Sequence, residues 1–232
     1  MSTSYRQRHC TQNLGPRGWL QGVELISHQT GKTVARYFGG VRYAQPPIGN
    51  LRFRKTKPLE PGFRYGSEES PCPCTGGCYI CPQPDWPGVL TPTDPNQWSE
   101  DCLGVNIWVP SGTPPPEGWP VLFYIHGGFL QFGNANKAAD VVARMYDETI
   151  FKAIVVMPGY RLNLFGFLAS KELQSEAQVD GENAGNMGFW DQRTALEWTA
   201  SMISAFGGNR DNITAAGYSA GASPLLLNLD KF

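Results

Sequence analysis

The chain has 232 residues, a length that usually makes one domain, and its 41% hydrophobic residues are enough to bury a substantial core. Its formal charge of −1 gives no electrostatic support for binding to nucleic acid or to an anionic membrane, so we expect neither as a partner. No apolar stretch is long enough to span a bilayer, and the first ten residues lack an apolar signal segment. We therefore expect a cytoplasmic protein, or a secreted one if the true start lies upstream.

The first half of the sequence predicts a hairpin followed by a long irregular segment. Two β-type runs, at 23–26 and 32–38, are joined by a Gln-Thr-Gly turn and predict two antiparallel strands. Residues 44–100 are rich in proline, glycine and other turn formers, which is unusual inside a compact domain unless the segment is functional or covalently tied. Regular structure is expected to resume with a strand at 105–109.

The second half of the sequence alternates strands with helices. Almost continuously apolar runs at 121–125 and 153–157 are typical of strands that are covered on both faces. Helices are expected over 138–146 and, from the helical spacing of the apolar residues, over 187–205. Asp191 lies near the start of the second helix, as the helix dipole favours. This alternation predicts an α/β sandwich with a mostly parallel sheet.

The pentapeptide Gly217-Tyr218-Ser219-Ala220-Gly221 has the pattern G-x-S-x-G and follows a β-type run at 211–216. It is typical of a nucleophile elbow, a sharp strand-to-helix turn that presents a serine hydroxyl above a parallel sheet. So tight a turn leaves no room for a Cβ at either glycine. A chance match is common in a chain with 27 glycines, so the motif needs support from elsewhere in the sequence.

The segment His126-Gly127-Gly128-Phe129 gives that support, because it directly follows the predicted strand that ends at Ile125. A glycine-rich loop after an early strand supplies backbone N–H donors for the oxyanion of acyl transfer, together with the N–H after the nucleophile. The alternative is an ordinary glycine turn, but the G-x-S-x-G motif later in the chain favours an oxyanion loop. We expect His126 to orient the loop rather than act as the base, because in this fold the catalytic histidine follows the serine.

Five sequence blocks occur in an order that is typical of one enzyme family. They are Phe38 to Pro47 with Leu51-Arg52-Phe53, Glu100 to Leu103 with Asn106-Ile107, His126-Gly127-Gly128, Gly185 to Gln192 with Ala195-Leu196 and Trp198, and Phe206 to Ala222. Together the blocks resemble type-B carboxylesterases, the α/β-hydrolase family that includes cholinesterases and fungal lipases. The resemblance implies an α/β-hydrolase fold, mostly parallel with an N-terminal antiparallel hairpin, that is truncated after the nucleophile-elbow strand and helix. It assigns residues 1–21 to an N-terminal tail and 22–232 to a partial domain.

The resemblance also assigns the site residues. Ser219 resembles the nucleophile of the family, and the backbone N–H groups of Gly128, Phe129 and Ala220 fall at its oxyanion donors. Phe129 stands where a third glycine often follows, a change that keeps a backbone donor. The resemblance therefore implies a serine carboxylic-ester hydrolase that acts on a small-molecule carboxylic ester without a cofactor. Which ester is left open, because the pockets that select it draw heavily on the half of the family sequence that this chain does not contain.

Six cysteines are present, and the resemblance accounts for two of them. Cys102 resembles the cysteine that closes a family disulfide loop, and Cys81, in a C-x-Q setting, resembles its partner, which implies a Cys81–Cys102 disulfide. Cys72, Cys74 and Cys78 have no evident counterpart. A metal knuckle is the alternative for this cluster, but it lacks a matching distant pair and a nearby histidine, so we expect no metal site.

The catalytic triad is incomplete in this sequence. His9, His28 and His126 all precede Ser219, and the only acidic residue after it is Asp230. In this fold both the acid and the histidine of the triad follow the nucleophile, so no triad of the family type can be assembled. The alternatives to an active hydrolase are a non-catalytic or binding protein on an esterase scaffold, or a longer product shortened by a wrong gene model or a premature stop.

The strand before Ser219 is expected to form an open edge of the sheet, although it normally lies in the middle. An exposed edge of this kind invites pairing with another chain. We therefore expect self-association through this edge, while the oligomeric state itself is left open.

Overall fold

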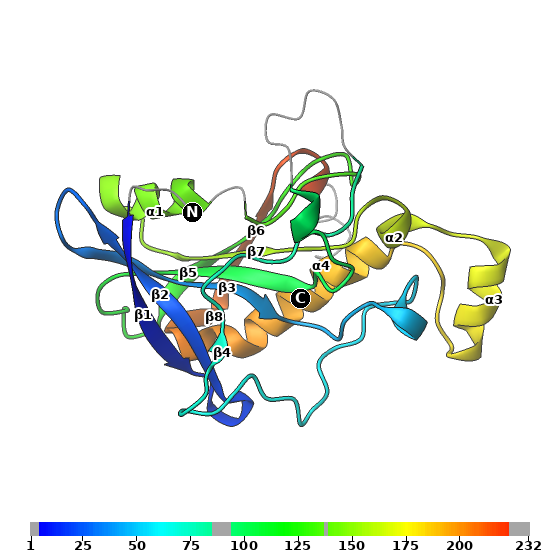
Figure 1. Cartoon of the computed structure of the whole chain (residues 1–232), viewed down its shortest axis with the longest axis horizontal. Coiled ribbons are helices and arrows are strands. Elements are labelled where there is room, and N and C mark those ends of the chain that lie inside the picture. Colours follow the sequence, from blue (N-terminus) through cyan, green and yellow to red (C-terminus); the bar gives the residue numbers. More distant parts are fainter. Residues whose placement is uncertain (1–4, 85–93, 137–138, 223–232) are drawn as a thin grey trace.

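The centre of the computed structural model is one mixed β-sheet, and the structure describes residues 5–84, 94–136 and 139–222 (Figure 1). Within these ranges the strands are β1 (Tyr5–Asn13), β2 (Trp19–Ser27), β3 (Thr33–Arg42), β4 (Cys72–Pro73), β5 (Gly104–Pro110), β6 (Trp119–Ile125), β7 (Ile154–Pro158) and β8 (Gly208–Gly217). Across the sheet they follow the order β1-β2-β3-β5-β7-β6-β8, and the short β4 pairs with β2.

Helices cover both faces of this sheet. The α-helices are α1 (Ala139–Glu148), α2 (Asn163–Phe167), α3 (Lys171–Val179) and α4 (Met187–Met202). Short 3-10 turns are η1 (Gly15–Arg17), η2 (Gly49–Leu51), η3 (Pro95–Gln97), η4 (Ile203–Phe206) and η5 (Ser219–Gly221). Figure 1 shows α1 on one side of the sheet and α4 on the other. None of the described helices combines the length and apolar character that crossing a bilayer requires.

Strand direction changes across the sheet. The predicted hairpin is confirmed, since β2 and β3 pair antiparallel. Antiparallel pairing also extends further, because β3 pairs antiparallel with β5, and β5 with β7. Parallel pairing joins β6 to β7 and to β8. Parallel strands need crossover connections. The connection from β6 to β7 contains α1, and the connection from β7 to β8, which lies on the other side of β6, contains α2, α3 and α4.

Residues 5–13 of the predicted N-terminal tail form an edge strand of the sheet. β1 pairs antiparallel with β2 along its whole length, from Tyr5 opposite Ser27 to Asn13 opposite Trp19. Most β1 side chains are exposed, so the strand shows little of the apolar alternation that marks a half-buried strand. Its pairing with β2, rather than its own sequence pattern, places it in the sheet.

The core lies in two layers, one on each face of the sheet. Ile107 and Phe123 belong to a cluster that contains Ala195 and Trp198 of α4. Trp108, the neighbour of Ile107 on β5, belongs to a second cluster that contains Tyr146 of α1. Successive strand residues point to opposite faces, so β5 contributes to both clusters. This arrangement is the α/β sandwich that the sequence predicts.

The chain from α4 to the end of the described region leads to the predicted elbow. α4 and η4 cover the predicted helix at 187–205, and Gly207 ends it in the left-handed conformation (φ 84°). β8 contains the predicted strand at 211–216. The helix predicted after Ser219 begins with η5, while its continuation from residue 223, together with Asp230, lies outside the described residues.

Candidate active site

Ser219, the predicted nucleophile, lies at the turn between β8 and η5 in the left-handed conformation (φ 53°). Such a conformation costs a residue other than glycine about 1–3 kcal/mol and persists only where the surrounding structure holds it. Hydrogen bonds close the turn, from Gly221 N–H to Tyr218 O (2.8 Å) and from Ala222 N–H to Ser219 O (2.9 Å). A Cβ on Gly217 would lie 2.3 Å from Gly221 O, so the turn is as tight as its sequence pattern predicts.

The segment after β6, residues 126–133, is called here the His-Gly-Gly loop. Three successive residues of this loop have positive φ: Gly128 (122°), Phe129 (55°) and Leu130 (61°). Among the described residues, no acceptor takes a hydrogen bond from the N–H groups of Gly128 and Phe129. The loop therefore holds two predicted oxyanion donors in a strained backbone, and the described part of the chain offers neither of them an acceptor.

The His-Gly-Gly loop packs directly against the elbow. A Cβ on Gly127 would lie 2.4 Å from Tyr218 O and 3.1 Å from Ser219 Cβ. A Cβ on Gly221 would lie 2.6 Å from His126 O. The two segments thus approach so closely that side chains at these glycines would push them apart. Ala220, the third predicted donor, follows Ser219 within η5.

A cavity of about 440 Å³ opens beside Ser219 and includes Gly128 and Phe129 in its lining. His126 and Asn134 also line it, and the remaining large side chains are apolar or aromatic and come from three secondary-structure elements and two loops. They are Tyr124 of β6, Val141 of α1, Met157 of β7, Phe132 of the His-Gly-Gly loop and Tyr218 of the elbow. Phe129 and Tyr218 are 73% and 68% exposed. A mostly apolar cavity of this size suits the apolar part of a small organic ligand.

His126 is held in place by contacts within and behind the loop. Its ring stacks on that of Tyr160, with 4.4 Å between the ring centroids. Its Nδ1 lies 2.9 Å from Gly127 O, and Tyr160 donates a hydrogen bond from its hydroxyl to His126 O (2.8 Å). These contacts fit a histidine that supports the loop, the role that we expect from the sequence.

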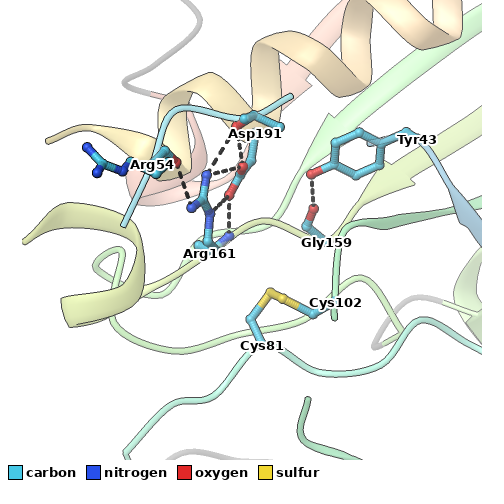
Figure 2. Close-up of polar contacts among 8 residues, drawn as sticks. Tyr43, Arg54, Cys81, Cys102, Gly159, Arg161 and Asp191 are labelled. Atoms are coloured by element: carbon cyan, nitrogen blue, oxygen red, sulfur yellow. Dashed lines mark hydrogen bonds and ion pairs between the residues drawn. A yellow bond between two sulfur atoms is a disulfide. The ribbon is translucent and has the colours of Figure 1, made fainter. Parts of the chain in front are cut away.

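The structure joins Cys81 to Cys102, the pair that the resemblance implies (Figure 2). Both cysteines are buried, and the bond connects the irregular segment to the residues that lead into β5. Two side chains that we did not predict as site residues, Gln83 and Asn163, link this region to the His-Gly-Gly loop. The C-x-Q setting of Cys81 was the available signal for Gln83, since it placed this residue beside the disulfide.

The other cysteines in the irregular segment are free thiols. Cys78 is buried, its thiol donates a hydrogen bond to Asn106 Oδ1 (3.3 Å), and burial raises its pKa to about 12. A hydrogen bond from Cys74 lowers the pKa of Cys72 to about 7, while the same interaction together with burial raises that of Cys74. No group of three or more metal-binding side chains occurs in the described parts of the chain.

A buried ion pair lies behind the site and ties α4 to the loop after β7 (Figure 2). Asp191 is 0% exposed and accepts hydrogen bonds from Arg161 Nε (2.9 Å), Arg161 Nη2 (2.8 Å) and the Arg161 backbone N–H (2.9 Å). Arg161 Nη1 donates to Arg54 O (2.9 Å), and Thr56 donates its hydroxyl hydrogen to Asp191. Burial alone lowers the pKa of Arg161, but Asp191 outweighs it and the pKa is raised.

Comparisons with known proteins identify the family of the chain. A family model described as "Carboxylesterase family" matches residues 9–229, beginning within β1 and ahead of the predicted domain boundary at residue 22. A carboxylic ester hydrolase from Gibberella moniliformis is 52% identical over 222 residues, which are 96% of this chain and 40% of that protein. Acetylcholinesterase 1 from Caenorhabditis briggsae is 37% identical over 217 residues, which are 90% of this chain and 32% of that protein.

Solved structures show the same fold. Juvenile hormone esterase from Manduca sexta matches with a TM-score of 0.72 and 31% identity, covering 94% of this chain and 37% of that chain. EstA from Aspergillus niger matches with a TM-score of 0.68 and 30% identity, covering 94% of this chain and 37% of that chain. The chain spans at most about 40% of the length of these relatives. It has the α/β-hydrolase fold and belongs to the carboxylesterase family.

Proposed function

We propose that this chain carries the nucleophile and the oxyanion hole of a serine carboxylic-ester hydrolase. The observation that supports this most is the strained Ser219, which lies against a loop where the N–H groups of Gly128 and Phe129 have no acceptor among the residues that the structure describes. The proposed substrate is a small-molecule carboxylic ester, and the apolar cavity beside Ser219 favours an ester with an apolar part.

In the proposed reaction, Ser219 Oγ attacks the acyl carbonyl carbon while its proton passes to a general base. The carbonyl oxygen becomes an oxyanion, which accepts hydrogen bonds from the backbone N–H groups of Gly128, Phe129 and Ala220. As this intermediate collapses, the base returns the proton to the departing alkoxide and the alcohol leaves. The base then takes a proton from water, whose oxygen attacks the acyl carbon, and gives that proton to Ser219 Oγ as the carboxylic acid is released. Backbone donors that are fixed in advance need no reorganisation during the reaction, and losing one donor typically costs ~100- to 1,000-fold in rate.

We propose that the general base and its orienting acid come from sequence outside this chain. In this fold both follow the nucleophile, and the chain spans 40% of its Gibberella relative. His126 is engaged with Tyr160 and Gly127, so it is a poor candidate for the base. In a serine protease with a convergent triad, losing the base lowers turnover by ~10⁶-fold, so turnover by this chain alone is expected to be very low.

Covalent labelling tests the proposal without requiring turnover. The purified 232-residue chain is treated with a fluorophosphonate, and the adduct is measured by intact-protein mass spectrometry, with Ser219→Ala as control. A single adduct that is absent from the Ser219→Ala variant is the expected result. A folded, soluble chain that gains no adduct at high probe concentration favours the alternative, a non-catalytic or binding protein on an esterase scaffold.

We also propose that the β8 edge pairs with another chain. Within the described sheet β8 pairs with β6 alone, which leaves one side of β8 with unpaired backbone groups. Size-exclusion chromatography with light scattering tests this directly. A dimer or larger species is expected, and a monomer at every accessible concentration contradicts the proposal.

The Cys81–Cys102 disulfide bears on where the protein works. Structural disulfides persist in oxidising compartments and are rare in the cytosol, so we propose an oxidising compartment in place of the expected cytoplasm. Thiol titration of chain isolated under alkylating conditions tests this. Four free thiols are expected from the six cysteines and the one pair (6 − 2 = 4), whereas six free thiols contradict it.

A further inference from the structure

The strained part of the His-Gly-Gly loop is fixed at both ends by groups from other segments. At its start, Tyr218 N–H donates to Ile125 O (3.2 Å) and Tyr160 donates its hydroxyl hydrogen to His126 O (2.8 Å). Inside the loop, the N–H groups of residues 131 and 132 donate to Gly128 O, which shapes the turn but does not fix its position relative to the elbow. The contacts at the far end of the loop are therefore needed to fix the orientation of the loop relative to the elbow.

Gln83 fixes that far end through the backbone of a single residue, Gly133. Its Oε1 accepts a hydrogen bond from Gly133 N–H (2.8 Å), and its Nε2 donates one to Gly133 O (2.9 Å). The Gln83 side chain is buried, and Nε2 also donates to Cys81 O (3.1 Å). A Cβ on Gly133 would lie 2.5 Å from His126 Nδ1, so the end of the loop packs back on its beginning. Gln83 thus joins the loop to the backbone of a disulfide-bonded cysteine.

Asn163 supplies a second link beside the strained residues. Its backbone N–H donates to Leu130 O (2.7 Å), and its Nδ2 donates to Pro82 O (2.8 Å). Asn163 itself has a positive φ of 46°, a conformation that asparagine tolerates better than most residues. Asn163 therefore links the carbonyl of Leu130 in the loop to the carbonyl of Pro82, the residue after Cys81.

We propose that Gln83 and Asn163 are positioning residues, which hold the His-Gly-Gly loop so that the N–H groups of Gly128 and Phe129 face the oxyanion formed at Ser219. The inference rests on the proposed function, because it concerns the same oxyanion hole. Neither side chain belongs to the loop. Gln83 bonds the backbone of Gly133, and Asn163 Nδ2 donates a long hydrogen bond to Gln131 O (3.5 Å) besides the one to Pro82 O. Without them, the left-handed residues would relax, and a displacement of about 1 Å can cost ~100-fold in rate.

The test compares three variants with a matched control. Gln83→Met keeps the length of the side chain and removes both hydrogen bonds to Gly133, while Gln83→Glu keeps the acceptor alone. Asn163→Gly keeps the backbone N–H and tolerates the positive φ but loses the link to Pro82. The control is Gln192→Met, because Gln192 is a buried glutamine of α4 whose amide has no hydrogen-bond partner among the described residues.

Two readouts separate positioning from general stability. Fluorophosphonate labelling is expected to show a maximal rate lowered ~10- to 100-fold in Gln83→Met and Asn163→Gly, with unchanged probe affinity and partial recovery in Gln83→Glu. Hydrogen exchange of residues 126–133 is expected to quicken at least tenfold in the same variants and to stay unchanged in Gln192→Met. Unchanged maximal labelling rates, or equal losses in Gln192→Met, overturn the inference.

The two proposals can fail separately. If the wild-type chain gains no label, the proposed function fails for this chain, and hydrogen exchange alone then decides the inference. Unchanged exchange of residues 126–133 in Gln83→Met and in Asn163→Gly overturns it in that case. If Gln83→Met does not fold, Asn163→Gly carries the same comparison, because it keeps the backbone N–H of residue 163 that donates to Leu130 O and removes only the side-chain amide.

Discussion

The Arg161–Asp191 pair and the His-Gly-Gly loop hold polar groups in opposite ways. The ion pair is fully buried, and Asp191 accepts four hydrogen bonds from Arg161 and Thr56. In the loop, strained residues hold the N–H groups of Gly128 and Phe129 without an acceptor among the described residues. A polar group whose bonds are all made inside the protein supports the fold, whereas one that is held but unpartnered can act on a ligand.

The largest expected effect comes from breaking the buried Arg161–Asp191 ion pair, where all the polar groups are hydrogen-bonded inside the protein. Asp191→Ala leaves the charge of Arg161 buried without a counter-ion, which typically costs about 3–5 kcal/mol in the free energy of unfolding. Urea unfolding followed by fluorescence measures this loss. The control is Asp211→Ala on an exposed position of β8, which is expected to change stability by less than about 0.5 kcal/mol. Equal losses in both variants would remove the distinction between the two sites.

An intermediate effect is expected at the Cys81–Cys102 disulfide, which lies next to the Gln83 link to the His-Gly-Gly loop. The double substitution Cys81→Ala with Cys102→Ala opens a loop of sequence separation 21 and is expected to cost about 3 kcal/mol in the loop-entropy model. A reducing agent should weaken the wild-type chain to a similar extent and leave the double variant unchanged in urea unfolding. Because Gln83 lies two residues from Cys81, exchange at Gly133 should quicken in both cases. A wild-type free energy of unfolding that does not change with the reducing agent would contradict a stabilising role for the disulfide.

The smallest expected effect is a gain in stability, and it is expected at Ser219 in the strained elbow. Ser219→Gly relieves the left-handed strain at the elbow and is expected to stabilise the fold by about 1 kcal/mol, while labelling is lost. Ser219→Ala removes the same hydroxyl but keeps the strain, so its stability should stay near that of the wild type. Thermal unfolding of both variants measures the difference. A less stable Ser219→Gly variant is incompatible with strain at this position.

The parts of this site that follow from local backbone demands could be predicted from the sequence. The glycines at 217 and 221 predict a tight turn around Ser219, and Gly127-Gly128 after a buried strand predicts a loop with an unusual backbone conformation. Such positions tolerate few residues, so a short pattern identifies them. The hairpin of β2 and β3 and the buried strands β6 and β7 could be predicted for a similar reason, because the apolar pattern of each strand lies within its own residues.

Features that depend on contacts between distant segments could not be read in the same way. Asp191 fits the helix dipole in the sequence, but its main partner is Arg161, 30 residues earlier. Gln83 contacts Gly133 across 50 residues, and nothing in the pattern of either segment indicates the other. β1 is polar and mostly exposed, so only its pairing with β2 reveals it as a strand.

The most direct test of the account follows the backbone N–H groups of the site themselves. In ¹⁵N-labelled chain, the amide resonances of Gly128, Phe129 and Ala220 are compared before and after a fluorophosphonate adduct forms, with Ser219→Ala as the control. The account predicts downfield shifts of these three amide protons, because each gains a strongly polar acceptor in the phosphonyl oxygen. An adduct on Ser219 that leaves all three resonances in place would contradict the assignment of this oxyanion hole.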